Sequence, residues 1–286
     1  MNTVNILCLG DIVGRPGRDA ISEYLATIKQ KHAIDLTIAN AENAAGGFGL
    51  NYKIYNELLD AGCDILTSGN HIYDKKEIIY DFDKLDQLIR PLNFPKGNPG
   101  YGYKIVPVKN IKVAVINLIG RVFVGHYDCP FQAIDTILPS ILEQTPIVII
   151  DMHAETTSEK EAMGWYLDGK VSLVFGTHTH VMTADLSILT NGTGYITDLG
   201  MAGALDSVLG MDRNAIIKRF LTQMPERFEP PKKPGQKIIN AIISRINTQT
   251  GKIESLEDVS YISPPQGKCR VMRGTSLLTK PNVKIQ

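Results

Sequence analysis

Short apolar runs rich in β-branched residues recur along the first 175 residues, and longer segments with a helical pattern separate several of them. The runs are residues 4–9, 36–39, 64–67, 113–117, 147–151 and 171–175, and the helical segments are 17–31, 52–61, 131–143 and 158–166. Strands that alternate with helices in this way predict an α/β fold. The strand list alone does not distinguish one doubly wound sheet from two sheets packed together.

Five of these strands are followed by side chains that can bind a metal ion. The side chains are Asp11; Glu42 and Asn43; Asn70, which precedes His71; His153; and His178 with His180. Ligands of open α/β sheets bind outside the carboxyl ends of the strands, because the loops there converge. Of six histidines, only His32 and His126 lie outside these loops. The sequence therefore predicts a metal site at this edge of the sheet.

Each of these residues has an ordinary structural explanation when it is taken alone. Asp11 can cap a helix, the two asparagines can form turns, and His153 can be a hydrogen-bonded core residue. The pair His178 and His180 is the most specific local signal, because residues i and i+2 of an extended chain share a side. Exposure of a polar loop is the alternative for that pair. Taken together, the five loops favour a metal site.

The donors are carboxylate, amide and imidazole groups without a thiolate, which suits Mn, Fe, Co or Zn better than a structural zinc site. Seven candidate ligands are too many for one ion: Asp11, Glu42, Asn43, Asn70, His153, His178 and His180. Two ions can share them if a carboxylate bridges the pair, as in sites that clamp an in-line displacement at phosphorus. We therefore expect two divalent ions as cofactors, Fe or Mn ahead of Zn, Co or Mg.

Composition excludes several other classes of protein. Lys plus Arg and Asp plus Glu both number 30, so no long-range field gathers nucleic acid or lipid. The sequence opens without a signal-peptide pattern, and no apolar run reaches the ~18 residues of a membrane span, so we expect a cytoplasmic protein. The cysteines are dispersed, which favours reduced thiols: Cys8, Cys63, Cys129 and Cys269.

After residue 181 the pattern changes to strand, turn and strand. Residues 186–189 and 195–197 flank the turn signal Asn191-Gly192, which predicts a hairpin. A second hairpin is expected from residues 237–246 and 252–262, after a proline-rich linker at 225–234. No composition shift marks a boundary, so we expect a single domain over residues 1–286, with the hairpin region of about 235–286 belonging to it.

The order of these motifs resembles that of the calcineurin-like metallophosphoesterases. Longer blocks are similar to the YmdB-like branch of that superfamily, described as 2′,3′-cyclic nucleotide phosphodiesterases: GDIVGRPGR, NAENAAGG, SGNHIYD, MHAETTSEKEAMGWYLDGKVSLVFGTHTHVMTAD and YITDLGMAGALDSVLGMDR. The resemblance runs from the first strand to about Arg227. It implies a four-layer sandwich in which two mixed β-sheets face each other and helices flank them.

The resemblance also implies a role for each ligand. One metal would be held by Asp11, Glu42, Asn43 and His180, and the other by Glu42, Asn70, His153 and His178. Two positions depart from the general superfamily pattern, since Val13 stands where a histidine is usual and Glu42 where the bridge is usually aspartate. Asn43 would then offer its amide oxygen to the metal that lacks the histidine.

The expected function is hydrolysis of small phosphodiesters, 2′,3′-cyclic nucleotides above all. A hydroxide bridging the metals would attack phosphorus, and His71 would give a proton to the departing oxygen. Arg15 and Arg121 are candidates for substrate contacts, although Arg15 is equally well explained by a helix start beside Pro16.

The expected partner is a small phosphodiester or nucleotide, with no membrane and no extended nucleic-acid surface; a homo-oligomer stays open. Two other functions stay open as well. One is a broader phosphatase or an RNA-end nuclease. The other is a non-catalytic nucleotide- or RNA-binding regulatory module, which would have no need of the proton donor His71.

Overall fold

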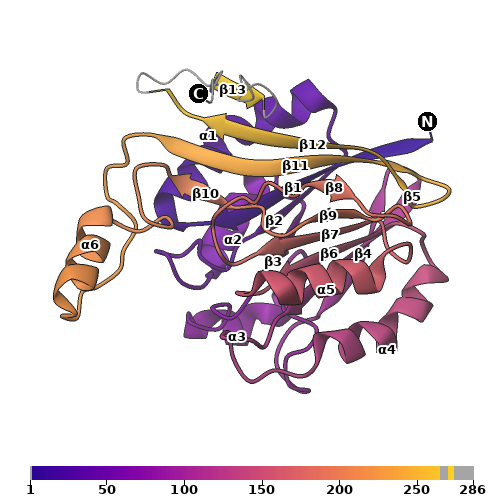
Figure 1. Cartoon of the computed structure of the whole chain (residues 1–286), viewed down its shortest axis with the longest axis horizontal. Coiled ribbons are helices and arrows are strands. Elements are labelled where there is room, and N and C mark those ends of the chain that lie inside the picture. The colour runs from indigo at the N-terminus through magenta and orange to yellow at the C-terminus, as the bar shows by residue number, and fades with distance from the viewer. Residues whose placement is uncertain (1, 265–269, 274–286) are drawn as a thin grey trace, which may run out of the picture.

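The computed structural model describes residues 2–264 and 270–273 and contains two β-sheets that face each other, with helices on their outer sides (Figure 1). The first sheet has the strand order β13 (Arg270–Arg273), β12 (Ile253–Ile262), β11 (Lys237–Asn247), β10 (Met201–Ala204), β1 (Thr3–Ile12), β2 (Leu36–Asn40) and β3 (Ile65–Thr67). The second has the order β4 (Tyr103–Val108), β5 (Ile111–Ile119), β6 (Val148–His153), β7 (Leu173–Thr177), β9 (Gly194–Ile196) and β8 (Ser187–Ile188). This confirms the α/β class and the two mixed sheets flanked by helices.

The helices lie mainly outside the pair of sheets. They are α1 (Gly14–His32), α2 (Tyr52–Asp60), α3 (Lys76–Asp81), α4 (Pro130–Leu142), α5 (Thr157–Leu167) and α6 (Arg213–Thr222), with a 3₁₀ turn, η1 (Phe82–Lys84), after α3. Helix α1 packs on β10 and β11 of the first sheet, and α4 and α5 pack on β5 and β7 of the second. Helix α6 stands apart from both sheets, at the left of Figure 1.

Alternation along the strands explains why four layers form. On β1, Leu7 and Leu9 pack towards α1, whereas Ile6 and Cys8 enter the core between the two sheets. Successive side chains of a strand point to opposite faces, so a strand that is apolar at every position is buried on both sides. Strand β6 is also buried on both faces: its alternate residues enter the core between the sheets and the core beneath α4 and α5.

Parallel pairing brings the functional ends of the strands together. Strands β1, β2 and β3 pair in parallel, and so do β5, β6, β7 and β9. Strand β1 changes its partner along its length: it pairs with β11 over Thr3 to Leu9 and with β10 at Asp11 and Ile12. Gly10 permits this switch, because a Cβ there would lie 2.1 Å from the carbonyl oxygen of Gly200.

Several elements were not expected from the sequence, namely β4, β10, α3 and α6. Strand β10 has the sequence MAGA, whose small residues carry no strand signal, and it forms because β1 and β11 both lie beside it. Both expected hairpins are present, as β8 with β9 and β11 with β12. The single-domain assignment stays a prediction.

Two further expectations concern cysteines and membranes. Cys8, Cys63 and Cys129 carry free thiols, while Cys269 lies outside the described residues. Burial raises the pKa of the Cys63 thiol to about 12, so this sulfur is packed as an apolar group. Within residues 2–264 and 270–273, no helix is both long and apolar enough to cross a membrane.

Candidate metal centre

The carboxyl ends of five strands place the expected ligands at one edge of the two facing sheets. Asp11 lies near the end of β1, His153 is the last residue of β6, and His178 follows directly after β7. Glu42 and Asn43 come just after β2, and Asn70 comes three residues after β3. The first sheet thus supplies the carboxylates and amides, and the second supplies the histidines.

The floor of this site is almost completely buried. Asp11 and His153 are fully buried, Glu42 is 1% exposed and Asn43 is 3% exposed. Two carboxylates removed from water in this way are strongly unfavourable unless cations compensate them. The burial alone therefore calls for positive charge at this position.

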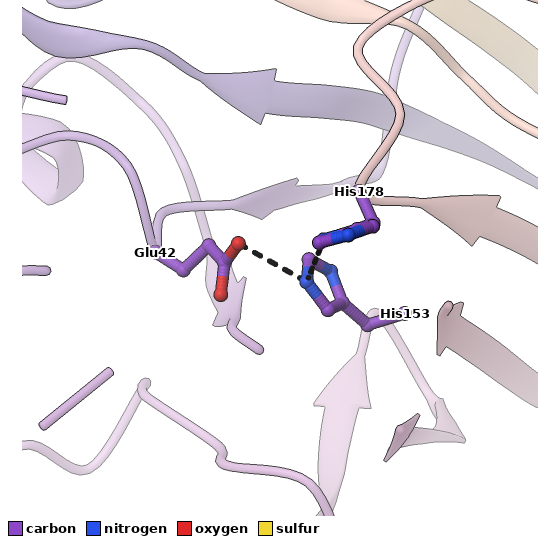
Figure 2. A group of neighbouring side chains, drawn as sticks. All are labelled: Glu42, His153 and His178. Carbon is purple, nitrogen blue, oxygen red and sulfur yellow. Dashed lines mark hydrogen bonds and ion pairs between the residues drawn. The ribbon is translucent and has the colours of Figure 1, made fainter. Parts of the chain in front are cut away.

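One group of ligands surrounds His153. Its Nε2 atom lies 3.0 Å from Oε1 of Glu42, 3.1 Å from Oδ1 of Asn70 and 3.1 Å from Nδ1 of His178. Figure 2 shows Glu42, His153 and His178 converging on a common point from the two sheets, and one donor atom of each lies within 4.8 Å of the others. These distances suit atoms that share one cation, since two imidazole nitrogens and two oxygens face the same small volume.

A second group surrounds His180. Its Nε2 atom lies 3.2 Å from Oδ1 of Asn43 and 3.8 Å from Oδ1 of Asp11. The amide nitrogen of Asn43 donates to the Gly47 carbonyl, which leaves its oxygen for the site. Asp11 Oδ1 is buried and accepts no hydrogen bond from the described residues, whereas Oδ2 accepts from the backbone N–H of His178. A buried carboxylate oxygen without a hydrogen bond is rare, and an ion bound at this position would account for it.

The outer nitrogen of each histidine ring is held by another group. Nδ1 of His153 bonds Oγ1 of Thr177 at 2.8 Å, and Nδ1 of His180 bonds the Leu209 carbonyl at 2.9 Å. Nε2 of His178 lies 3.0 Å from Oε2 of Glu155. Such partners fix the tautomer and the orientation of metal-binding imidazoles, so one nitrogen of each ring is free to face an ion.

The loop that carries His178 and His180 is not extended, in contrast to the geometry assumed from the sequence. His178 has φ 101° and His180 has φ 63°, a left-handed region that non-glycine residues rarely adopt. The two rings consequently face different ligand groups, His178 towards His153 and His180 towards Asn43. Strain in this loop is offset by Asp198, which accepts a hydrogen bond from the Thr179 N–H.

Charges in the cluster are strongly coupled. Burial opposes ionisation of Glu42, but the ion pair and hydrogen bond with His153 lower the pKa of Glu42 to about 2. Burial lowers the pKa of His153, and Glu42 with Asp11 raises it more, to about 9. Burial and the neighbouring His153 lower the pKa of His178 to about 3.

His71 stands at the edge of the cluster and presents a ring that the ligands leave free. Its backbone N–H donates to Oε2 of Glu42 at 3.1 Å, which ties it to one of the candidate ligands. Its Nδ1 atom lies 2.8 Å from Oδ2 of Asp74, and Phe48 packs against the ring at 5.0 Å between centroids. With Nδ1 engaged by Asp74, Nε2 is the nitrogen available for proton exchange.

The two candidate arginines lie away from the ligands. Arg15 pairs with Asp19 at 3.6 Å and lines a separate cavity of about 730 Å³ next to the site. Arg121 is exposed, and its backbone N–H donates to Glu159. Neither lines the cavity that contains the metal-facing residues, and their contact with substrate stays a prediction.

Several supporting residues were missed by the sequence reasoning. Asp151 is buried two residues before His153 on the same side of β6, and it accepts hydrogen bonds from Thr67 and Thr177. Burial raises its pKa to about 7. The spacing Asp-x-His on one strand is the signal that could have identified it. Asp74 and Glu155 carried no such signal, because only folding brings them to the histidines.

A buried ion pair lies directly behind the histidine loop. Nζ of Lys160 in α5 lies 2.7 Å from Oδ2 of Asp198, and the two side chains are 1% and 0% exposed. Asp198 also accepts hydrogen bonds from the backbone N–H groups of Thr179 and Gly200. The pair therefore connects α5 with the loop that carries two ligands.

Comparison with known proteins gives matches that span all seven candidate ligands. A family model described as YmdB-like protein matches residues 7–259. A 2′,3′-cyclic-nucleotide 2′-phosphodiesterase of Bacillus subtilis (strain 168) is 48% identical over 256 residues, which cover 90% of this chain and 96% of that protein.

Two solved structures are also similar to this chain. The crystal structure of a novel phosphatase from Mycoplasma pneumoniae matches with a TM-score of 0.86 and 34% identity, over 92% of this chain and 94% of that one. A hypothetical protein from Thermus thermophilus matches with a TM-score of 0.84 and 36% identity, over 91% of this chain and 100% of that one. The two-sheet fold therefore recurs at this level of sequence identity.

Proposed function

Because this chain belongs to the YmdB-like protein family, we propose that it is a metal-dependent phosphodiesterase that hydrolyses 2′,3′-cyclic nucleotides. The Bacillus subtilis relative is named for this activity. The observation that carries the proposal is the buried ligand cluster, in which carboxylate, amide and imidazole atoms from both sheets converge and one buried carboxylate oxygen accepts no hydrogen bond from the described residues. His71 at the rim adds a proton donor.

The donors suit two divalent ions per chain, Fe or Mn ahead of Zn, Co or Mg. Asp11, Glu42, Asn43 and His180 would hold one ion, and Glu42, Asn70, His153 and His178 the other. Glu42 suits the bridging role, because Oε1 lies 3.0 Å from Nε2 of His153 in one group and the carboxylate lies close enough to Asp11 of the other group for their charges to repel. When bound, such ions lower the pKa of water towards neutrality and offset charge on the phosphate oxygens.

The chain itself supplies orientation and the proton. Asp74 holds Nδ1 of His71, and Phe48 packs against the ring, so that the imidazole keeps one orientation at the rim. In that orientation Nε2 can deliver a proton to the ribose oxygen that leaves phosphorus. Opening of the cyclic phosphate then yields a nucleoside monophosphate.

The proposal is tested by measuring metal content together with hydrolysis of 2′,3′-cAMP, bis(p-nitrophenyl) phosphate and p-nitrophenyl phosphate. We expect two metal equivalents and fastest turnover of the cyclic nucleotide. The Glu42→Gln variant should lose both activity and metal, because it removes the shared carboxylate. Glu161→Gln, an exposed position on α5, is the control for the same change in charge.

Each result decides between named functions. Faster turnover of p-nitrophenyl phosphate would favour the broader phosphatase. Binding of 2′,3′-cAMP without turnover by the metal-loaded protein would favour the regulatory module. A Glu42→Gln variant that keeps its full metal content would contradict the bridging role.

A further inference from the structure

The metal-facing cavity has two chemically different sides. It encloses about 380 Å³, near the lower end of the range of about 300–1,000 Å³ that suits small ligands. The polar part of its lining belongs to the floor and consists of Glu42, Asn43, His71, Glu155, His178, Thr179 and His180. The rest of the lining is apolar, and we call these side chains the apolar wall: Phe48, Val208, Leu209, Met211, Ile216, Phe220 and Phe228.

Two side chains of the apolar wall are largely exposed although they border the cavity. Phe220 in α6 is 72% exposed although it borders the cavity, and Leu209 is 47% exposed. Among the described residues no lysine or arginine lines this cavity, so a phosphate is attracted to the floor and not to the wall. The exposed apolar wall is therefore suited to a flat apolar group that belongs to a phosphodiester whose phosphate lies at the floor.

We propose that the apolar wall, with Phe220 as its main contact, binds the nucleobase of the substrate and gives the site its preference for nucleoside over base-free phosphodiesters. The proposal rests on the proposed phosphodiesterase function. Aromatic side chains stack on every nucleobase, so this contact would accept several bases. It assigns substrate selection to α6, an element that contributes no ligand.

Helix α6 is anchored well enough to serve this role. Ile216, which is 7% exposed, packs with Val13, Met201 and Met211 beneath the helix. Asp212 caps its first turn by accepting hydrogen bonds from the N–H groups of Asn214 and Ala215. The neighbouring segment is tied to the floor, since the Leu209 carbonyl bonds Nδ1 of His180.

The larger cavity around Arg15 is a less suitable base site. It is lined by several charged groups, among them Asp19, Lys75, Glu226 and Glu229. None of the candidate metal ligands lines it, whereas Phe48 and Phe228 border both cavities. A base joined to a phosphate on the floor meets the apolar wall first.

The test compares Phe220→Ala with Leu221→Ala in the metal-loaded enzyme. Leu221 is 81% exposed on the same helix and does not line the cavity, so it is a matched control. Substrates are 2′,3′-cAMP, 2′,3′-cGMP and glycerol 1,2-cyclic phosphate, which has no base. We expect Phe220→Ala to lower kcat/KM for both nucleotides about tenfold, through KM, and to narrow their preference over the glycerol ester by the same factor.

Leu221→Ala should keep the wild-type preference, and Phe220→Trp should retain the preference that Phe220→Ala loses. An unchanged substrate ratio in Phe220→Ala would overturn the proposal. The proposal would also be overturned if both alanine variants lost the preference for nucleotides equally and changed their oligomeric state in sedimentation. In that case α6 would contact a second copy of the chain.

Failure of the proposed function gives a different result. In that case the wild-type protein hydrolyses neither cyclic ester, and calorimetric titration with adenosine 2′-monophosphate tests the apolar wall separately. An affinity about tenfold weaker in Phe220→Ala than in Leu221→Ala would support base binding. Equal affinities would overturn it.

Discussion

The floor and the apolar wall of one cavity are built in opposite ways. The floor is polar and mostly buried, its side chains lie at or just beyond the ends of strands, and hydrogen bonds connect them. The wall is apolar and partly exposed, and its main aromatic side chain lies on α6, which stands apart from the sheets (Figure 1). Strand ends place donor atoms accurately because the sheet holds the backbone. The exposed side chains of α6, in contrast, can be substituted without moving the ligands.

This difference implies that the floor determines turnover and the wall determines which substrate is chosen. Variants of the floor should reduce activity on every phosphodiester. Variants of the wall should alter only the ratio between substrates. The following changes test that division, in order of expected effect.

Replacing His71 with Ala should have the largest effect. We expect kcat to fall about 10²- to 10⁴-fold for nucleotide and base-free substrates alike, because the general acid is lost. Metal content should stay the same, since the ring of His71 contacts Asp74 and is not one of the candidate ligands. His126→Ala, at an exposed position, is the control. Loss of metal in His71→Ala, or an effect restricted to nucleotides, would contradict the division.

Replacing Lys160 with Met should destabilise the fold by about 3–5 kcal/mol, because Asp198 would be left as a buried charge without its partner. Urea unfolding measures the change, and metal analysis tests whether the histidine loop is displaced as well. The double variant Lys160→Met with Asp198→Asn should recover part of the stability, since it removes the unpaired charge. A single variant as stable as wild type would show that the pair is dispensable.

Replacing Glu155 with Gln should have a smaller effect, confined to metal affinity. Oε2 of Glu155 lies 3.0 Å from Nε2 of His178, so Glu155 orients a candidate ligand through the ring nitrogen that faces away from His153. Loss of such a partner typically weakens metal binding about 10- to 100-fold. Competition with a chelator measures it, and activity at saturating metal should be close to normal. If the control Glu161→Gln lost as much metal affinity, the change in net charge and not the contact with His178 would explain the effect.

The candidate ligands could be predicted because each lies at, or within three residues of, the end of a strand whose sequence is recognisable. Asp11, Glu42 and His153 lie within a few residues of buried β-branched runs, and parallel strands bring such positions to one edge. The same argument does not extend to Asp74, Glu155 and Leu209. Their partners are histidines whose rings take their positions only after the loops have folded.

Fold prediction failed where tertiary contacts override weak local signals. Strand β10 consists of small residues that favour no particular element, and it exists because Gly10 lets the backbone of residue 200 approach β1. Helix α6 exposes Phe220 and Leu221 on a chain segment whose apolar residues do not form one buried stripe. The sequence of α6 therefore lacks the apolar pattern by which a helix packed on the core is recognised.

The sequence by itself determined the α/β class, the positions of the strand ends and the chemical nature of the donors, because all three depend on local pattern and residue type. The local pattern left one sheet or two open, and the resemblance to the YmdB-like branch implied the two sheets that the structure contains. Only the tertiary structure decided that His178 and His180 turn towards different ligand groups and that α6 lies beside the polar floor. Those outcomes depend on which strands pair and which faces are buried together. Such choices are made by contacts between residues far apart in the chain, which no local pattern records.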